Sequence, residues 1–262
     1  GSIGLYERPG IGKHHSKFHG ETLVVERHFG STVQVVFTGG HHNPAKPATV
    51  ALIAINCFIF VLTHDITMLG GASLERDSLV KWATYGFPID AIGEWWRLAS
   101  GAFLHADVRH LLLNMIMLFL LGRRLERQIG SPAFIGLCVI SMLWGSMGAL
   151  IATPNTAVVG ASGIVYGIMA AVLVVERSSG KDPWNEGLGT LIIVNIVLSF
   201  VIPGISVGGH LGGLTGGLIG GWIAGDQRQR SLLRILAGFP IAALLGFALG
   251  LIAAKTWLDP VI

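Results

Sequence analysis

Seven stretches of this sequence are dominated by apolar residues and have roughly the length that a membrane-spanning helix requires. About 20 mostly apolar residues are needed for one helical crossing of a bilayer. Several stretches also contain glycine, histidine, asparagine or serine, and polar groups within a bilayer usually face the protein interior. The pattern predicts an all-α polytopic membrane protein, a helical bundle with seven crossings. The stretches cover residues 48–64, 106–122, 133–153, 160–175, 188–203, 207–224 and 232–254.

Composition supports this interpretation and excludes an ordinary soluble domain. Of the 262 residues, 52% are hydrophobic and 13% are charged, whereas soluble domains carry about 25% charged residues. Cys57 and Cys138 both lie inside apolar stretches, so neither a disulfide framework nor a thiolate metal site is predicted. The formal net charge of +3 is interpreted as a topology signal, and no nucleic-acid partner is expected.

The distribution of Lys and Arg predicts the orientation. With seven crossings, 13 of the 18 basic residues fall on the side of the N-terminal tail and five on the other side. The positive-inside rule then places the N-terminus in the cytoplasm and the C-terminus on the extracytoplasmic side. No continuous apolar segment follows a basic start, so no signal peptide is predicted, and we expect the plasma (inner) membrane of a bacterium.

Three regions are expected along the chain. Residues 1–47 form a polar N-terminal cytoplasmic tail that we expect to be flexible, and 48–224 form a six-helix core. Residues 225–262 supply a connecting loop and the seventh helix. The first loop, 65–105, is expected to lie partly in the membrane interface, because it contains residue types that favour the lipid headgroup level. These residues are Trp95, Trp96 and Arg97.

The N-terminal tail contains a cluster of histidines that has two interpretations. One is a metal site, because imidazole is a common metal ligand. The other, which we favour, is a set of surface histidines on a tail without chemistry of its own. The histidines are His14, His15, His19, His41 and His42.

Two polar clusters near the outer ends of helices supply groups suited to acyl transfer. His110 and Asn114 are four residues apart, so they share one helical face. Ser162 opens the fourth stretch, where unpaired backbone N–H groups and the helix dipole stabilise a developing oxyanion. Taken alone, each residue is better explained by helix packing than by catalysis.

A third cluster, in the sixth stretch, supplies a base and a close helix contact. His210 has a near-neutral reference pKa and suits the removal of a proton from the weakly nucleophilic Ser162 hydroxyl. Gly213 and Gly217 follow His210 at +3 and +7, which leaves that helix face bare enough for another helix to pack closely. Close contact with the fourth helix would set the distance between Ser162 and His210.

In combination, these residues form the acyl-transfer arrangement of a serine hydrolase that needs no acidic third member. His110, Asn114 and the backbone N–H of Ser162 would donate to the oxyanion of a tetrahedral intermediate. The sequence resembles the rhomboid intramembrane serine proteases over residues 48–224, with its motifs in the order of that family. The motifs are Trp96-Arg97, His105, His110-x-x-x-Asn114, Gly160-x-Ser162-Gly163, Tyr166 and His210-x-x-Gly213-x-x-x-Gly217.

The resemblance implies a rhomboid-like six-helix bundle with an additional seventh helix, and a role for each motif residue. It implies that Ser162 is the nucleophile and that His210 is the general base. His110 and Asn114 would form the oxyanion hole, and Tyr166 would pack against the His210 ring. The supporting residues implied by the motifs are His105, Gly160 and Gly163, and Glu126 with Gly130 matches a structural feature after the second helix.

The expected function is therefore a serine-type endopeptidase that hydrolyses peptide bonds in or near transmembrane segments. Its partners would be membrane lipid and transmembrane substrates with helix-destabilising residues, which enter beside the fifth segment, 188–203. The site would face the extracytoplasmic side, and no metal or organic cofactor is implied. One alternative is an inactive rhomboid-like protein that binds membrane-protein clients. Another is a seven-helix transporter, which charged residues at mid-membrane or an inverted repeat would favour; the sequence contains neither.

Overall fold

The structure is a computed structural model in which the chain divides into two compact units, Gly1–Ala45 and Lys46–Ile262. Each unit is described by itself. The described residues are 13–18, 21–27, 33–38, 47–65, 73–182, 184, 187–202, 204–225 and 232–258.

The first unit contains a three-stranded antiparallel sheet that departs from the all-α expectation. Strands β1 (Lys13–Phe18), β2 (Glu21–Arg27) and β3 (Val33–Thr38) are ordered β1-β2-β3. Strands β2 and β3 are short runs that contain valine and threonine, residues that favour strands, whereas β1 contains neither. None of the three strands has the length of a membrane-spanning segment. His14 and His15 lie in β1, whereas His19, His41 and His42 lie outside the described residues.

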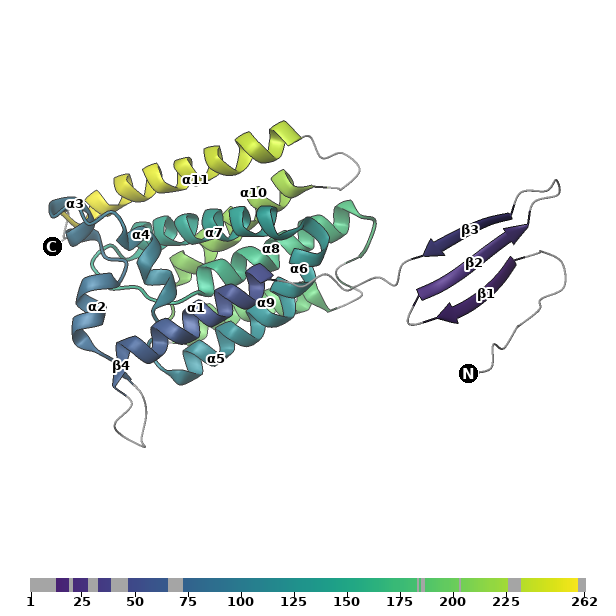
Figure 1. Ribbon diagram of the computed structural model, residues 1–262. Helices are drawn as coiled ribbons and strands as arrows, with labels where there is room; N and C mark the ends of the chain where they lie inside the picture. The colour runs from purple at the N-terminus through teal and green to yellow at the C-terminus, as the bar shows by residue number, and fades with distance from the viewer. Residues whose placement is uncertain are drawn as a thin grey trace. The chain divides into compact units, whose positions relative to one another are not determined.

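In the second unit, each of the seven predicted stretches contains a helix, and these helices run side by side (Figure 1). The second stretch is a helix that continues without a break through a π-helical turn, η2. The bounds are α1 (Pro47–Thr63), α5 (Val108–Met117), η2 (Leu118–Gly122), α6 (Arg123–Ile129), α7 (Ser131–Ala152), α8 (Ser162–Ser178), α9 (Leu188–Val201), α10 (Val207–Ala224) and α11 (Leu232–Ala254).

The first loop is built from short elements. It contains two-residue strands β4 (His64–Asp65) and β5 (Ser73–Leu74), helices α2 (Arg76–Trp82), α3 (Gly86–Ala91) and α4 (Arg97–Ser100), and the turn η1 (Gly101–Phe103).

The position of Arg97 differs from the expectation that this residue lies at the level of the lipid headgroups. The Arg97 side chain is buried, and its guanidinium donates to the carbonyl oxygens of Ala83 (3.1 Å) and Val80 (2.7 Å) and to Glu94 Oε2 (2.6 Å). Trp95 remains exposed. The guanidinium fork satisfies several acceptors at once, so Arg97 holds the loop together from inside.

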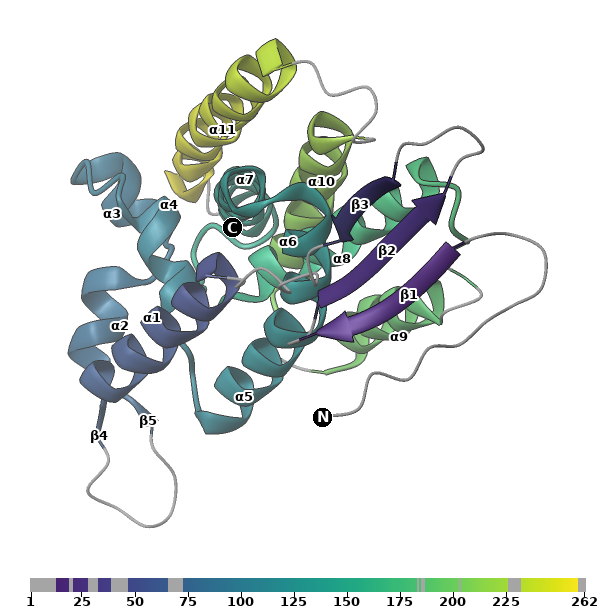
Figure 2. The ribbon, with the colours of Figure 1, turned by 45° about the vertical axis from the view of Figure 1, so that its right-hand side comes forward.

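Helix α7 is the centre of the second unit. Figure 2 shows it nearly along its axis, with α4, α10 and α11 around it. Its side chains Phe134, Leu137 and Ile140 are fully buried, as the central position requires. The chain enters α7 through Gly130 at φ +81°, a conformation that glycine adopts without steric cost.

Glu126 joins three helices at the start of α1. Its carboxylate accepts hydrogen bonds from the backbone N–H groups of Ala48 (3.1 Å) and Thr49 (2.9 Å), from Thr49 Oγ1 (2.6 Å) and from Ser131 Oγ (2.6 Å). Unpaired N–H groups at a helix N-terminus favour a negative partner. The carboxylate of α6 therefore caps α1 and binds the first residue of α7, which is a structural role.

Helix α11 is tied to the rest of the unit at both ends and in the middle. Arg234 donates to the carbonyl oxygens of Trp222 and Ile223 at the end of α10. Trp144 of α7 donates through Nε1 to the Ala242 carbonyl (3.0 Å). After α11, in the turn η4 (Lys255–Leu258), Trp257 Nε1 donates to Asp90 Oδ2 of α3 (3.0 Å).

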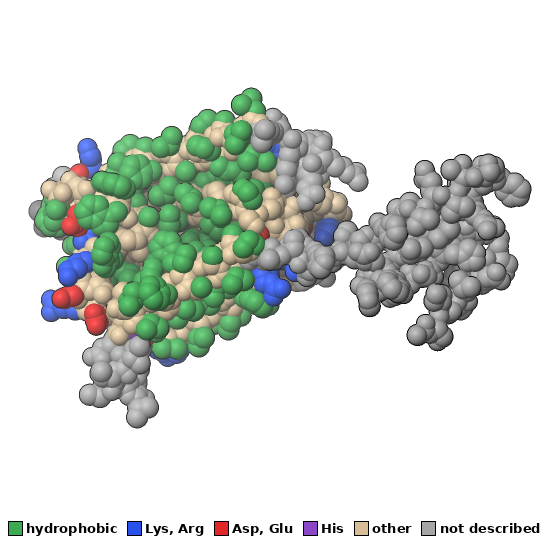
Figure 3. All heavy atoms as spheres, in the orientation of Figure 1, with side chains coloured by type: hydrophobic (Ala, Val, Ile, Leu, Met, Phe, Trp, Pro, Cys, Tyr) green, Lys and Arg blue, Asp and Glu red, His purple; other side chains and the backbone are tan. Residues whose placement is uncertain are grey.

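The exterior of the second unit is strongly apolar. In Figure 3 hydrophobic side chains cover most of the visible face of this unit, and charged side chains gather at its ends. Among the described residues, two helices are long and apolar enough to cross a membrane, Ser131–Ala152 and Leu233–Trp257. Pro47–Thr63 and Gly189–Val201 are shorter apolar helices.

Candidate active site

Ser162 is the first residue of α8, and the loop before it is held against the first-loop elements. Gly160 donates its backbone N–H to the Gly101 carbonyl (2.9 Å), and Thr84 pairs with Val158 as an isolated antiparallel bridge. The first N–H groups of a helix have no intrahelical partners. Ser162 is therefore presented on an anchored loop beside unpaired donors.

The His110 ring packs directly on the backbone of Gly160. A Cβ atom at Gly160 would lie 2.6 Å from His110 Cε1 and 2.7 Å from Nε2, and Gly160 has φ +125°. Only glycine fits such a position without a shift of the ring. His110 Nδ1 accepts a hydrogen bond from the Ala106 backbone N–H (3.4 Å), which assigns the ring proton to Nε2 on the side that faces Gly160.

Asn114 lies one turn after His110, as the spacing predicts. It is buried, and its Nδ2 donates to the His110 carbonyl (3.0 Å). An amide NH₂ has two hydrogens, so a second N–H remains for another acceptor. Asp107 caps this helix by accepting from the His110 backbone N–H (2.9 Å).

His105 is fully buried between η1 and α5, outside the long helices. Its Nε2 accepts from the backbone N–H of Ala161 (3.5 Å), and its ring meets His110 edge to face at 5.1 Å between centroids. Burial, with a smaller contribution from the neighbouring His110 and His64, lowers the pKa of His105 to about 3. His105 is thus a neutral imidazole that supports the backbone immediately before Ser162.

His210 lies in the first turn of α10 and is held on two sides. Tyr166 of α8 stacks on its ring with 4.0 Å between centroids and 18° between planes, as the resemblance implies. Its Nδ1 lies 2.7 Å from Ser199 Oγ of α9. Ser206 caps α10 by accepting from the Gly209 backbone N–H (3.1 Å).

Glycines bring the backbones of α7, α8 and α10 together beside these residues. A Cβ atom at Gly213 would lie 2.8 Å from Gly163 Cα, and one at Gly145 would lie 3.2 Å from the Gly209 carbonyl oxygen. Small residues allow such approach between helices. Because Gly163 follows Ser162 and Gly209 precedes His210, this contact places the backbone beside Ser162 close to the backbone beside His210.

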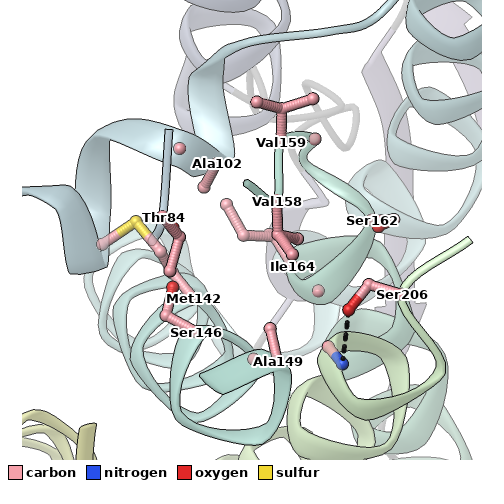
Figure 4. A pocket seen from close by; sticks show the side chains of 15 residues that line it. Thr84, Ala102, Met142, Ser146, Ala149, Val158, Val159, Ser162, Ile164 and Ser206 are labelled. Atoms are coloured by element: carbon pink, nitrogen blue, oxygen red, sulfur yellow. Dashed lines mark hydrogen bonds between the residues drawn. The ribbon is translucent and has the colours of Figure 1, made fainter. Parts of the chain in front are cut away.

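A cavity of about 30 Å³ opens at Ser162. A water molecule needs about 10–15 Å³ of such volume together with polar partners, so the cavity has room for water. Among the described residues, no hydrogen bond joins the Ser162 hydroxyl to His210. Figure 4 shows side chains that line the cavity, among them Thr84, Ser146, Ser162 and Ser206.

The structure thus brings together the residues of all three predicted clusters, from α5, α8 and α10. Within the described part of the chain, no group of three or more His, Cys, Asp or Glu side chains is arranged to hold a metal ion. The sequence reasoning missed Ser199 and Asn195, whose backbone carbonyl accepts from Tyr166 Oη (2.7 Å). A signal was present, since both are polar residues four apart on an otherwise apolar helix.

The fold and the site define a helical bundle with an apolar exterior and a serine and a histidine on adjoining helices. The family profile described as Rhomboid domain matches residues 92–227, slightly more than half of the chain. The chain therefore belongs to the rhomboid family. Helix α11 lies beyond the matched residues.

Individual relatives agree with this assignment. The chain is 31% identical to rhomboid protease GluP of Bacillus subtilis over 169 residues, which cover 64% of the chain and 31% of the relative. It is 32% identical to the B. subtilis protein YdcA over 150 residues, 54% of the chain and 75% of the relative. Rhomboid protease GlpG of Yersinia pestis is 27% identical over 139 residues, 51% of the chain and 45% of the relative. The chain thus aligns with about a third of GluP and three quarters of YdcA.

Proposed function

We propose that this protein is an intramembrane serine endopeptidase that cleaves transmembrane proteins in or near their membrane-spanning segments. The observation that carries the proposal is the contact between α8 and α10. Ser162 lies at the N-terminus of α8 beside a cavity, and the ring of His210 on α10 stacks on Tyr166 of α8. The names of GluP and GlpG as rhomboid proteases support it.

In the first step, Ser162 attacks the scissile carbonyl carbon while His210 Nε2 takes the hydroxyl proton. The hydrogen bond between the Ser162 hydroxyl and Nε2 would form when substrate is bound, as catalytic hydrogen bonds often do. Collapse of the tetrahedral intermediate breaks the C–N bond, and the same proton passes to the leaving amine. Water then attacks the acyl-enzyme, and His210 carries the proton of that water back to Ser162.

The oxyanion of each tetrahedral intermediate is stabilised by three donors. These are His110 Nε2–H, the second hydrogen of the Asn114 amide, and the backbone N–H of Ser162. The tautomer of His110 and the free hydrogen of Asn114 support this assignment. Removing one such donor typically costs a hundredfold or more in rate.

The cavity supports the hydrolytic half of the reaction. Hydrocarbon excludes water, so a protease inside a bilayer needs a polar space enclosed by protein. Ser146, Ser162 and Ser206 are among the residues that line the cavity. The substrate helix hides its own carbonyl in an internal hydrogen bond, so we expect substrates to carry glycine or proline that loosens the helix near the cleaved bond.

The proposed setting is the plasma membrane of a bacterium, with all seven long helices crossing it. The N-terminus is cytoplasmic and the C-terminus extracytoplasmic, because 13 of the 18 Lys and Arg residues fall on the N-terminal side. Ser162 and His210 lie in the first turns of α8 and α10, and the loop before Ser162 is hydrogen-bonded to the first-loop elements, which are extracytoplasmic in this topology.

The experiment that tests the proposal is labelling of the detergent-solubilised full chain with a fluorophosphonate, followed by mass spectrometry of the modified peptide. We expect modification of Ser162 and its loss in Ser162→Ala and His210→Ala. Ser178→Ala is the matched control, because this serine lies at the opposite end of α8 and its hydroxyl donates to the Val175 carbonyl (2.8 Å). A folded wild-type protein without labelling would favour the inactive, client-binding alternative.

A further inference from the structure

The imidazole of His210 has a partner on the nitrogen that the proposed reaction does not use. Ser199 of α9 is 4% exposed, and its Oγ lies 2.7 Å from His210 Nδ1. Ser199 Oγ also lies 2.8 Å from the Asn195 carbonyl oxygen and 2.8 Å from Tyr166 Oη. His210 on α10, which contacts Tyr166 of α8, is therefore also hydrogen-bonded to a residue of a third helix, α9.

The hydrogens of this network can be assigned by counting donors and acceptors. The Asn195 carbonyl oxygen only accepts, and it receives hydrogen bonds from Ser199 Oγ (2.8 Å) and Tyr166 Oη (2.7 Å). When both hydroxyl hydrogens point to this carbonyl, the lone pairs of Ser199 Oγ face His210. His210 Nδ1 must then carry the ring hydrogen and donate it to Ser199.

The opposite assignment, in which Ser199 donates to His210 Nδ1, makes one hydrogen bond fewer. If Ser199 donated to His210 Nδ1, the ring hydrogen would move to Nε2, where the described residues offer it no hydrogen-bond partner. The Nδ1–H assignment instead pairs all three hydrogens of the network inside the protein, and each internal hydrogen bond stabilises that arrangement. The network therefore favours the tautomer with a bare Nε2, which is the form that accepts a proton.

We infer that Ser199 is a positioning residue that sets the tautomer and the rotation of His210; the inference rests on the proposed function. In a serine-histidine-aspartate triad a carboxylate binds the corresponding nitrogen. Within the described residues no carboxylate hydrogen-bonds His210, and the Ser199 hydroxyl takes that place as a neutral acceptor. When His210 gains the Ser162 proton, the Nδ1–H bond to Ser199 is kept.

The hydrogen bond between His210 Nδ1 and Ser199 also makes the orientation of the His210 ring depend on the position of α9. His210 belongs to α10 and Tyr166 to α8, so Ser199 is the contact that α9 contributes. Ser199 and Ile192 are buried, whereas Phe200 and Val201 on the same helix are exposed. A displacement of α9 would remove the acceptor from Nδ1.

The first test reads the tautomer directly and does not need activity. The full chain is labelled with ¹⁵N-histidine, and the His210 ring signals are identified by their loss in His210→Ala. We expect a protonated Nδ1 and a bare Nε2 in the wild type near neutral pH, a mixture of tautomers in Ser199→Ala, and the wild-type pattern in Ser199→Thr, which keeps the hydroxyl. A wild-type His210 with its proton on Nε2 would overturn the inference, even if Ser199→Ala failed to fold.

The second test measures cleavage of a reconstituted transmembrane substrate. Ser199→Ala should lower kcat about tenfold to a hundredfold, the range for hydrogen bonds to a charged group, and leave KM unchanged. Ser199→Thr should restore most of the rate. The matched control is Thr215→Val, because Thr215 on α10 makes the same type of bond to the carbonyl four residues earlier (2.9 Å, Leu211). A wild-type kcat in Ser199→Ala contradicts the inference.

The two tests separate this inference from the proposed function. A wild-type protein that neither cleaves substrate nor reacts at Ser162, but whose His210 tautomer responds to Ser199→Ala, would refute the protease and keep the positioning contact. An active wild type whose tautomer is the same in Ser199→Ala would keep the protease and refute the role of Ser199.

Discussion

The phenol ring of Tyr166 lies parallel to the imidazole of His210, with ring centroids 4.0 Å apart and 18° between the planes. The two residues come from different helices, α8 and α10, and both are buried. The stack defines the plane of the imidazole, while the bond from Nδ1 to Ser199 defines its rotation within that plane. Together they leave His210 Nε2 as the free edge of the ring.

Replacement of Tyr166 should separate the effect of its ring from that of its hydroxyl. Tyr166→Phe keeps the stack and should stay within a few-fold of the wild-type kcat, whereas Tyr166→Leu should lose up to about tenfold, because aromatic pairs contribute about 0.5–1.5 kcal/mol beyond burial. Cleavage kinetics of a transmembrane substrate measure both. Tyr85→Leu, a change of the same type in the first loop, is the control. Equal rates in Tyr166→Phe and Tyr166→Leu would show that stacking is unimportant.

Asn114→Ala should lower kcat by about a hundredfold to a thousandfold, the usual cost of one oxyanion donor, without reducing the yield of folded protein. Asn56→Ala is the matched control. Its amide makes the same bond to a carbonyl four residues earlier, Leu52 at 2.8 Å, but it lies on α1 away from Ser162. We expect Asn56→Ala to affect thermal stability and to leave kcat unchanged. Loss of activity in both variants alike would argue for a general packing effect.

At the contact between α8 and α10, an added methyl group should cost more stability on α10 than on α8. At Gly213 a Cβ would lie 2.8 Å from Gly163 Cα, but at Gly163 the nearest atom to an added Cβ is Gly145 Cα at 3.5 Å. Overpacking costs about 1–3 kcal/mol, so Gly213→Ala should lower the melting temperature more than Gly163→Ala does. Gly213→Leu should separate the helices and abolish cleavage. Full activity in Gly213→Leu would refute the role of this contact.

The bond between Trp257 and Asp90 should couple α11 to the first loop. A double-mutant cycle of Trp257→Phe and Asp90→Ala is expected to give a coupling on the order of 1 kcal/mol in thermal or denaturant unfolding. The control cycle pairs Asp90→Ala with Trp144→Phe, which removes a bond to the middle of α11 and should be additive. A coupling of zero for Trp257 with Asp90 would mean that this bond does not dock the helix.

His105 should make folding stability depend on pH. Its pKa is lowered from 6.5 to about 3 in the folded protein, mainly by burial, so below 6.5 the unfolded chain binds a proton that the folded chain does not. Stability is therefore complete above that pH and falls as the pH decreases toward 3. We expect melting temperatures to decline from about pH 7.5 to about pH 5 and to decline less in His105→Asn. Identical pH profiles for both proteins would exclude this contribution.

Local patterns in the sequence were sufficient to locate the long helices and to indicate candidate reactive groups. A buried or lipid-facing helix needs a continuous apolar run, so its position along the chain can be found from the sequence alone. Each predicted stretch contains a helix. His110 and Asn114 were assigned to one face because helical spacing is regular. The strands of residues 13–38 were missed because short runs of this kind lack a distinctive length.

Only the tertiary structure decided which distant groups meet. Arg97 is buried because three acceptors, the carbonyls of Ala83 and Val80 and the Glu94 carboxylate, converge on it, and composition alone had assigned it to the lipid interface. Ser199 became a partner of His210 because the packing of α9 brings its hydroxyl to Nδ1. Neither contact leaves a periodic signal, since hydrogen bonds between elements depend on how helices pack and not on spacing along the chain. The sequence by itself determined the long helices and the candidate reactive groups, whereas the orientation of those groups followed from packing.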